Sequence, residues 1–404
     1  MNFVIFLMAY YFEDAATESR RFDDFQVWRA SVRSDSKTLN LMNALKEKDV
    51  WRSSGDSIDF LLKSNETEHF NRTLNAYNIS YEVFLNNVQE RIDKENETQN
   101  ARRSEGKKSL WNTFPTPTEI SEYLKIVSKA NPSVCTLSTI GTTEHKRNIM
   151  MLRISNKSKR FHTPILIEGG MHSREWASVP AVLYLIEQIV WNFTKQPAYI
   201  QAMDWHIIPL LNPDGYQYSM STNRLWRKNR RIFSGPCDGV DVNRNFPLGW
   251  GLSPSANIIC SDEYSGPIAL SEAEAIAIKN ILESNHFHVY VSVHSYGNSI
   301  YIPWLMNGKP TKDNHVQTKI AKSMAAAMSQ VDHKTFKYGH VRRGRKSSGM
   351  AIDWAYKVHG VVFAFVIETR GSNMGGFLLN HEEILPSSKE VFAGIDKLVQ
   401  EVNP

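Results

Sequence analysis

The chain has 404 residues, which exceeds the ~100–200 residues of a typical domain, so we expect two or three domains. Hydrophobic residues make up 42% and charged residues 22%, values that exclude a disordered chain, a fibrous rod and a polytopic membrane protein. The formal net charge of +5 comes from lysines and arginines interleaved with acids, so we expect no nucleic-acid partner.

The N-terminal residues predict secretion. An apolar run at 4–12 is far shorter than the ~20 residues that span a bilayer, and Ala15 and Ala16 follow it. We interpret 1–16 as a signal peptide, although the usual preceding positive charges are missing; the alternative is a buried strand of a cytosolic protein. Six N-x-S/T sequons also favour a secreted glycoprotein. They begin at Asn65, Asn71, Asn78, Asn96, Asn156 and Asn192.

Residues 25–88 form a compact α/β unit in the sequence pattern. The periodicity predicts strands at 25–32, 57–63 and 81–88, and helices at 37–48 and 67–77. The next segment, 89–109, is dense in charge and nearly free of large apolar side chains, which predicts an exposed connector. It contains Arg102 and Arg103, and a dibasic pair there is equally well a processing site or part of an ordinary solvated linker.

From Trp111 onward the pattern predicts a larger α/β unit. Thr116, Pro117 and Glu119 indicate a helix start, as do Ser271 with Glu274 and Ser387 with Glu390. Short apolar runs predict strands, several of them of the type found inside a largely parallel sheet. The predicted strands are 134–140, 148–154, 164–167, 205–211, 287–293 and 361–367, and the helices between them are 178–192, 271–284 and 317–330.

Polar residues follow several of these strands. His172 and Glu175 come after the strand at 164–167, and their spacing of three would put both on one face of a helical turn. His294 ends the strand at 287–293, and Glu368 ends the strand at 361–367. Because open α/β sheets bind ligands at the carboxyl ends of their strands, we expect these groups to converge. Two imidazoles and a carboxylate suit a zinc site, whereas an isolated H-x-x-E pattern is usually part of a solvated helix face.

The chain resembles the zinc carboxypeptidases of the A/B type, the M14 metallopeptidases. The segments that carry the resemblance are HSREW at 172–176, NPDGY at 212–216, LWRKNR at 225–230, GVDVNRN at 239–245, HSY at 294–296, IDW at 352–354 and ETR at 368–370. The resemblance implies a mixed, mostly parallel central sheet with helices on both faces, preceded by a small ferredoxin-like α/β prodomain. It places an activation propeptide at 20–103 and the catalytic domain at 111–402.

The resemblance also implies the roles of individual residues. His172, Glu175 and His294 would bind one Zn²⁺ and leave a position open for water. Glu368 would be the general base, and Arg227 would stabilise the developing oxyanion. The implied substrate-binding residues are Arg174, Asn243, Arg244, Ser295, Tyr296, Ile352 and Phe377, with Asn243 and Arg244 on the terminal carboxylate. The implied disulfide joins Cys237 to Cys260, and the implied activation cut is at Arg102 and Arg103.

The implied activity is that of a secreted, monomeric zymogen that binds peptide C-termini and is activated by a trypsin-like protease. Ile352, where B-type enzymes carry Asp, favours release of apolar or aromatic terminal residues, and Leu305 would narrow the pocket. Two departures from the family pattern oppose a simple transfer. Arg345 lies nearest the position of the family's capping tyrosine, within a cationic stretch that would suit an acidic side chain, and Thr-Arg-Gly follows Glu368.

Two other functions stay open from the sequence. One is a weakly active or inactive peptidase-like protein that binds peptide C-termini through Asn243 and Arg244. The other is a zinc amidohydrolase acting on small acyl amino acids, which shares the pattern of His172, Glu175 and His294. Retention of Glu368 opposes the first alternative, and the propeptide-like unit opposes the second.

Overall fold

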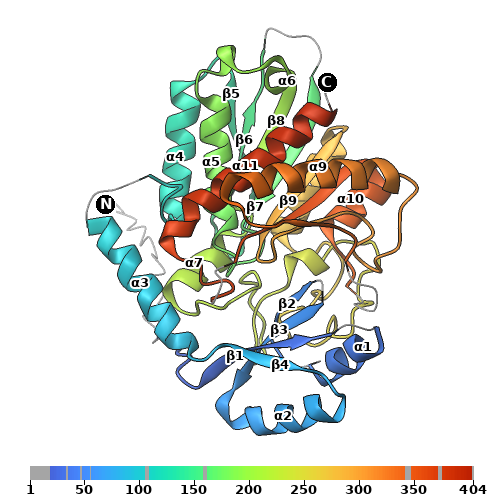
Figure 1. Ribbon diagram of the computed structural model, residues 1–404. Coiled ribbons are helices and arrows are strands. Elements are labelled where there is room, and N and C mark those ends of the chain that lie inside the picture. Colours follow the sequence, from blue (N-terminus) through green and yellow to red (C-terminus); the bar gives the residue numbers. More distant parts are fainter. Residues whose placement is uncertain are drawn as a thin grey trace, which may run out of the picture.

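The computed structural model describes residues 19–32, 35–45, 48–54, 56–104, 109–157, 162–341, 347–371 and 375–402. The expected signal peptide at 1–16 and Arg345 lie outside these residues. Two units are visible, a small N-terminal one and a larger one that follows it (Figure 1). None of the helices in the described part of the chain has the length and apolar character needed to cross a membrane.

The N-terminal unit is an antiparallel sheet with two helices. Four strands in its described residues are arranged in the order β2-β3-β1-β4, and the helices α1 and α2 lie on the same side as one another (Figure 1). The bounds are β1 Phe25–Ser31, α1 Asp35–Ala44, β2 Val50–Ser54, β3 Ser57–Lys63, α2 Thr67–Ala76 and β4 Tyr81–Leu85. The sequence pattern predicted all of these elements except β2.

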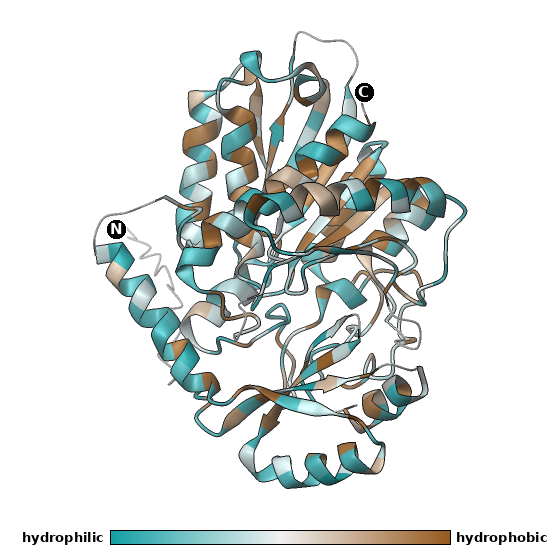
Figure 2. Ribbon diagram, in the orientation of Figure 1, coloured by the Kyte–Doolittle hydropathy of each residue, from teal (hydrophilic) through white to brown (hydrophobic). Residues whose placement is uncertain are grey.

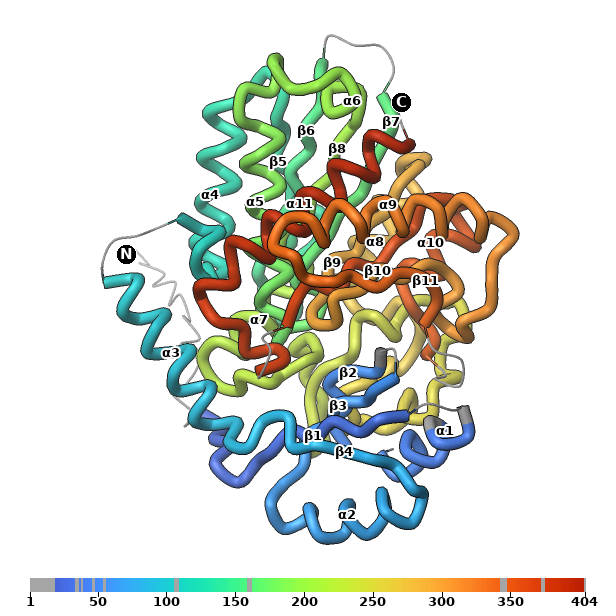
Figure 3. The backbone as a smooth tube through the Cα atoms, viewed as in Figure 1, coloured from blue at the N-terminus to red at the C-terminus, as the bar shows by residue number. Residues whose placement is uncertain are grey.

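The segment predicted to be an exposed connector is instead the helix α3, Val88–Ser104, which runs along the larger unit (Figure 3). Figure 2 shows it as mostly hydrophilic, yet Ile92, Glu95 and Gln99 are buried against the larger unit. Glu95 accepts hydrogen bonds from Arg224, and Gln99 donates to the carbonyl of Phe114. The prediction was wrong because α3 is held by polar partners distant in sequence together with two buried apolar residues, Val88 and Ile92, which are too few to give a helical apolar pattern.

The larger unit contains a mixed sheet. Counting the residues described, it has eight strands in the order β11-β10-β12-β9-β7-β8-β6-β5, and its four central strands β12, β9, β7 and β8 are parallel. The bounds are β5 Cys135–Thr142, β6 Asn148–Ile154, β7 Thr163–Gly169, β8 Met203–Ile208, β9 Val289–Ser295, β10 Ser299–Tyr301, β11 Lys337–Gly339 and β12 Phe363–Thr369. The predicted fold class, a mostly parallel sheet behind a small α/β unit, is confirmed.

Helices cover both faces of this sheet. Alternate residues of the strands point into two separate apolar cores, as Ile165 and Ile167 do on one face and Leu166 does on the other. The first core contains side chains of α4, α5, α9 and α11, and the second contains side chains of α8 and α10. The bounds are α4 Pro117–Ala130, α5 Ser178–Val190, α6 Ala198–Gln201, α7 Pro213–Ser221, α8 Ala273–Ser284, α9 Asn314–Asp332, α10 Ala351–His359 and α11 His381–Val402, with short 3₁₀ turns at Ser64–Glu66, Phe193–Lys195 and Val242–Arg244.

The predicted helix starts have different outcomes. Thr116 caps α4 as expected, because its side chain accepts from the backbone N–H of Glu119 and Glu119 reaches back. Ser271 does not cap α8, whose N-cap is Glu272. The last helix begins at His381 and not at Ser387, since α11 continues through Pro386.

Candidate functional site

The parallel strands bring the predicted site residues to one edge of the sheet. His294 of β9 and Glu368 of β12 are direct neighbours across the parallel pair. His172 and Glu175 lie just beyond the end of β7, the strand on the other side of β9. They lie in a turn, with the Glu175 N–H donating to the His172 carbonyl at 3.2 Å, and not on a helix as the spacing suggested.

His172, Glu175 and His294 form a buried cluster. Their ligand atoms all lie within 4.8 Å of one another. The Nδ1 atoms of the two histidines are 3.1 Å apart, and each lies 2.8 Å from an oxygen of Glu175. All three side chains therefore direct their potential metal-ligand atoms to one point. The backbone N–H of Ser295 donates a hydrogen bond to Glu175 and holds this carboxylate in place.

Outer contacts fix which histidine nitrogen is protonated. The Nε2 atom of His172 lies 3.1 Å from an oxygen of Asp241, a carboxylate that can only accept, so this Nε2 carries the proton. Ser292 donates its hydroxyl to Glu168, so its oxygen accepts from Nε2 of His294 at 2.8 Å. Both Nδ1 atoms then present lone pairs beside the Glu175 carboxylate. Three converging acceptors repel one another without a cation, and this nitrogen and oxygen set fits zinc.

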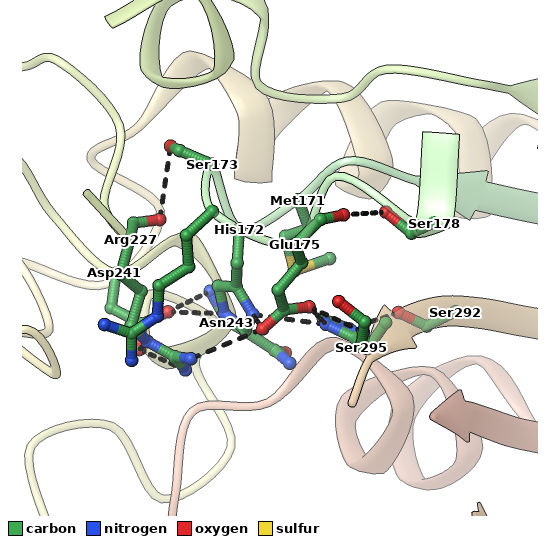
Figure 4. Close-up of polar contacts among 12 residues, drawn as sticks. Met171, His172, Ser173, Glu175, Ser178, Arg227, Asp241, Asn243, Ser292 and Ser295 are labelled. Atoms are coloured by element: carbon green, nitrogen blue, oxygen red, sulfur yellow. Dashed lines mark hydrogen bonds and ion pairs between the residues drawn. The ribbon is translucent and has the colours of Figure 1, made fainter. Parts of the chain in front are cut away.

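Asp241 was missed as a site residue in the sequence, although it lies within the segment at 239–245. It is fully buried and accepts two hydrogen bonds from Arg227, at 3.0 and 2.9 Å, and one from the backbone of Asn243. Burial alone would raise its pKa, but Arg227, Arg244 and His172 outweigh burial and hold the pKa of Asp241 well below its usual value. Asp241 therefore stays ionised and links His172 of the cluster to Arg227 (Figure 4), and it also lies 3.8 Å from Arg244.

Arg227 points its remaining nitrogen at the metal cluster. With Nε and one terminal nitrogen held by Asp241, the other terminal nitrogen lies 3.6 Å from Glu175. Burial would lower the pKa of this guanidinium, but Asp241 and Glu175 raise it, so Arg227 is a permanent cation. Glu368 is half-buried and lines one cavity together with Arg227 and the three residues of the cluster.

Asn243 and Arg244 belong to the 3₁₀ turn Val242–Arg244 and line the same cavity. The amide oxygen of Asn243 accepts from the backbone of Ala351 at 3.1 Å, which leaves its NH₂ group as a donor. Arg244 is 1% exposed, and within the described residues its Nε–H meets no acceptor. One of its terminal nitrogens donates to Glu263. The turn thus presents several donors to a buried position.

The N-terminal unit covers this cavity. Arg174 donates to Asp49 at 2.8 Å, and the hydroxyl of Tyr296 donates to Asp59 at 2.8 Å. The rings of Phe377 and Trp51 pack 5.1 Å apart, centroid to centroid. Asp49, Asp59 and Trp51 all belong to the N-terminal unit. No sequence pattern predicts these contacts, because each joins residues far apart in the chain.

Of the two residues expected to set specificity, Leu305 lines the cavity and Ile352 does not. Leu305 lines the cavity together with Tyr301 and Met350. Ile352 is 1% exposed in the apolar core that also holds Leu305, and it does not line the cavity in the described structure.

Arg102 and Arg103 occupy the last turn of α3. The expected disulfide between Cys237 and Cys260 is present, and Cys135, outside this pair, is buried.

Comparisons with known proteins agree with this geometry. A family described as "Zinc carboxypeptidase" matches residues 120–394, and "Carboxypeptidase activation peptide" matches 28–95. Zinc carboxypeptidase A 1 of Anopheles gambiae is 28% identical over 96% of this chain and 91% of its own, and human carboxypeptidase A1 is 29% identical over 92% and 90%. A crystal structure of carboxypeptidase A from Helicoverpa armigera is 28% identical, covers 95% of this chain and 98% of its own, and superposes with a TM-score of 0.86. The chain therefore belongs to the zinc carboxypeptidase family, as a metallocarboxypeptidase with His172, Glu175 and His294 as its zinc ligands and an activation propeptide before the catalytic unit.

Proposed function

We propose that this protein is a secreted zymogen that, once processed, removes single apolar or aromatic residues from peptide C-termini. The observation that carries the proposal is the position of buried Asn243 and Arg244 in the same cavity as the zinc ligands. A carboxylate bound by these donors brings the last peptide bond of the substrate to the metal cluster.

The chemistry is hydrolysis of that peptide bond. His172, Glu175 and His294 would hold a zinc ion, which would supply a Lewis acid for the carbonyl and lower the pKa of water enough for deprotonation at neutral pH. Glu368 takes the proton of the attacking water as its oxygen bonds to the carbonyl carbon. Arg227 stabilises the negative charge that develops on the carbonyl oxygen, because the terminal nitrogen that Asp241 does not hold already faces the cluster. Glu368 then passes the proton to the amide nitrogen as the carbon–nitrogen bond breaks.

The donors around Arg244 support exopeptidase specificity. The Nε–H of Arg244, which meets no acceptor among the described residues, and the NH₂ group of Asn243, whose amide oxygen is held by Ala351, suit a terminal carboxylate that accepts several hydrogen bonds. An internal peptide segment offers no carboxylate, so a buried cation would lack its counter-charge there. Apolar side chains along the cavity, those of Leu305, Tyr301 and Met350, support an apolar terminal residue.

The contacts of the N-terminal unit support a zymogen. Arg174, Tyr296 and Phe377 are expected to bind the substrate, and each contacts a residue of the N-terminal unit. Substrate and propeptide would thus compete for the same groups. We propose activation by a trypsin-like protease at Arg102 and Arg103, with a propeptide of 20–103 and a catalytic domain of 111–402.

Two features support secretion. The disulfide between Cys237 and Cys260 is of a kind that persists in oxidising compartments. Several of the sequon asparagines are exposed and available for glycosylation. These are Asn65, Asn78, Asn96 and Asn192.

The direct test uses blocked dipeptides that differ only at the C-terminus. After tryptic cleavage, we expect hydrolysis of a substrate ending in free phenylalanine and no hydrolysis of its C-terminal amide. Replacing Arg244 by Ala should lower kcat/KM by about a hundredfold or more, because a charged bidentate contact is lost. Equal hydrolysis of the free acid and the amide would refute the exopeptidase assignment, and binding without hydrolysis would support the inactive C-terminus-binding alternative.

A further inference from the structure

In the turn Val242–Arg244, which we propose binds the substrate carboxylate, Arg244 is already paired with a carboxylate of this chain, that of Glu263. Glu263 accepts a hydrogen bond from a terminal nitrogen of Arg244, and its second oxygen accepts from Ser255 at 3.0 Å. Glu263 lies three residues after Cys260, which the disulfide joins to Cys237. Glu263 and Ser255 both line the cavity that contains Asn243 and Arg244.

The charges nearby explain what Glu263 does when no substrate is bound. Arg244 is 1% exposed, and its other close acid, Asp241, is 3.8 Å away. Asp241 is also used by Arg227 and His172. A buried guanidinium with so small a share of one carboxylate is costly, and Glu263 supplies the missing counter-charge.

Exposure indicates which partner can leave. The side chain of Glu263 is 28% exposed, whereas that of Arg244 is 1% exposed. A substrate carboxylate can therefore displace Glu263 towards solvent while Arg244 stays in place. The exchange replaces one ion pair by another, so the substrate gains only the difference between the two interactions.

We propose that Glu263 is a built-in competitor for the substrate's terminal carboxylate, which stabilises the substrate-free enzyme and weakens substrate binding. This inference rests on the proposed role of Arg244. It differs from a purely structural role of Glu263 in sign: removing the charge should lower stability and raise affinity together. A structural role predicts that both would fall.

The test compares Glu263→Gln with the unaltered protein. Both proteins are made as the full chain and then cleaved with trypsin before the assay. Gln keeps the size of the side chain but not its charge. We expect KM for a blocked dipeptide ending in phenylalanine to fall by about tenfold, the scale of one charged hydrogen bond, with kcat within about twofold. The inhibition constant of 3-phenylpropionate, a small carboxylate, should fall by a similar factor. The melting temperature without ligand should fall.

Two further variants control the test. Glu283→Gln removes the same charge from an exposed pair with Lys279 on α8 and should leave KM unchanged. Ser255→Ala keeps the charge of Glu263 but removes one of its hydrogen bonds, and should lower KM by about threefold. This variant keeps the inference testable if Glu263→Gln fails to fold.

A KM that stays unchanged or rises in both Glu263→Gln and Ser255→Ala would overturn the inference. Its failure is distinct from failure of the proposed function, because hydrolysis of the C-terminal amide tests the role of Arg244 separately. If the unaltered, processed protein does not hydrolyse the free acid, the proposed function is refuted, whatever effect Glu263→Gln has on binding.

Discussion

Replacing Asp241 by Asn should weaken both the fold and the zinc site. Asp241 is fully buried and lies 2.9 Å from a terminal nitrogen of Arg227. At an effective dielectric constant of about 20, two unit charges at this distance attract by about 6 kcal/mol, part of which offsets their desolvation. Asn keeps one acceptor oxygen but loses the charge, and we expect a loss of about 3 kcal/mol in unfolding free energy. Because Asp241 also orients His172, zinc affinity should fall by about 10–100-fold.

Chemical denaturation and competition with a chromogenic chelator measure the two effects. Asp204→Asn is the matched control, since Asp204 also accepts two hydrogen bonds from one arginine, Arg153. Arg153 is 51% exposed, so solvent screens its pair with Asp204, although Asp204 is itself buried and also lies 3.2 Å from His206. The control should therefore lose less stability than Asp241→Asn, about 1–2 kcal/mol, with unchanged zinc affinity. An Asp241→Asn protein with the zinc affinity of the control would refute the argument that Asp241 fixes His172.

Three other substitutions test separate parts of the molecule. Glu368→Gln should retain zinc, measured as metal content, while kcat falls by about a hundredfold or more. Near-normal turnover would show that another group is the general base. Asp49→Asn should raise the activity of the uncut protein on a blocked dipeptide, because Arg174 loses its partner in the propeptide; unchanged activity would contradict the covering role. Burial raises the pKa of Glu274 from 4.5 to about 7 in the folded protein. Between these pH values the unfolded chain ionises Glu274 more readily than the folded protein does, so the free energy of unfolding falls as the pH rises from 4.5 to 7. At pH 8, denaturant titration should therefore give Glu274→Gln a free energy of unfolding about 2 kcal/mol above that of the unaltered protein. The difference should vanish near pH 4.

The sequence predicted the central sheet well because its strands are buried on both faces. Continuous apolar runs, such as 164–167, leave little choice of structure, and β7 lies within a residue or two of its expected position. Helix α3 was missed because its buried residues include Glu95 and Gln99, whose partners lie in the larger unit. A pattern of apolar residues contains no record of such pairing.

The site was predictable where function depends on residue type and strand order. His172, Glu175 and His294 come together because parallel neighbouring strands end at the same edge. The roles of Asp241 and Glu263 were not predictable, since each follows from a side chain that turns towards an arginine in three dimensions. A loop sequence does not indicate which of its acids will do so.

The helical conformation of Arg102 and Arg103 has a kinetic consequence. Proteases bind the chain around the cut in an extended form, but here both arginines lie in α3 and donate to the carbonyls of Asn112 and Phe114. If the chain is cut there, the last turn of α3 has to unwind first. The rate of cleavage then equals the intrinsic rate multiplied by the fraction of molecules that are open at this turn. Each ~1.4 kcal/mol that holds the turn closed slows cleavage by about tenfold, so the end of one helix sets the timing of activation.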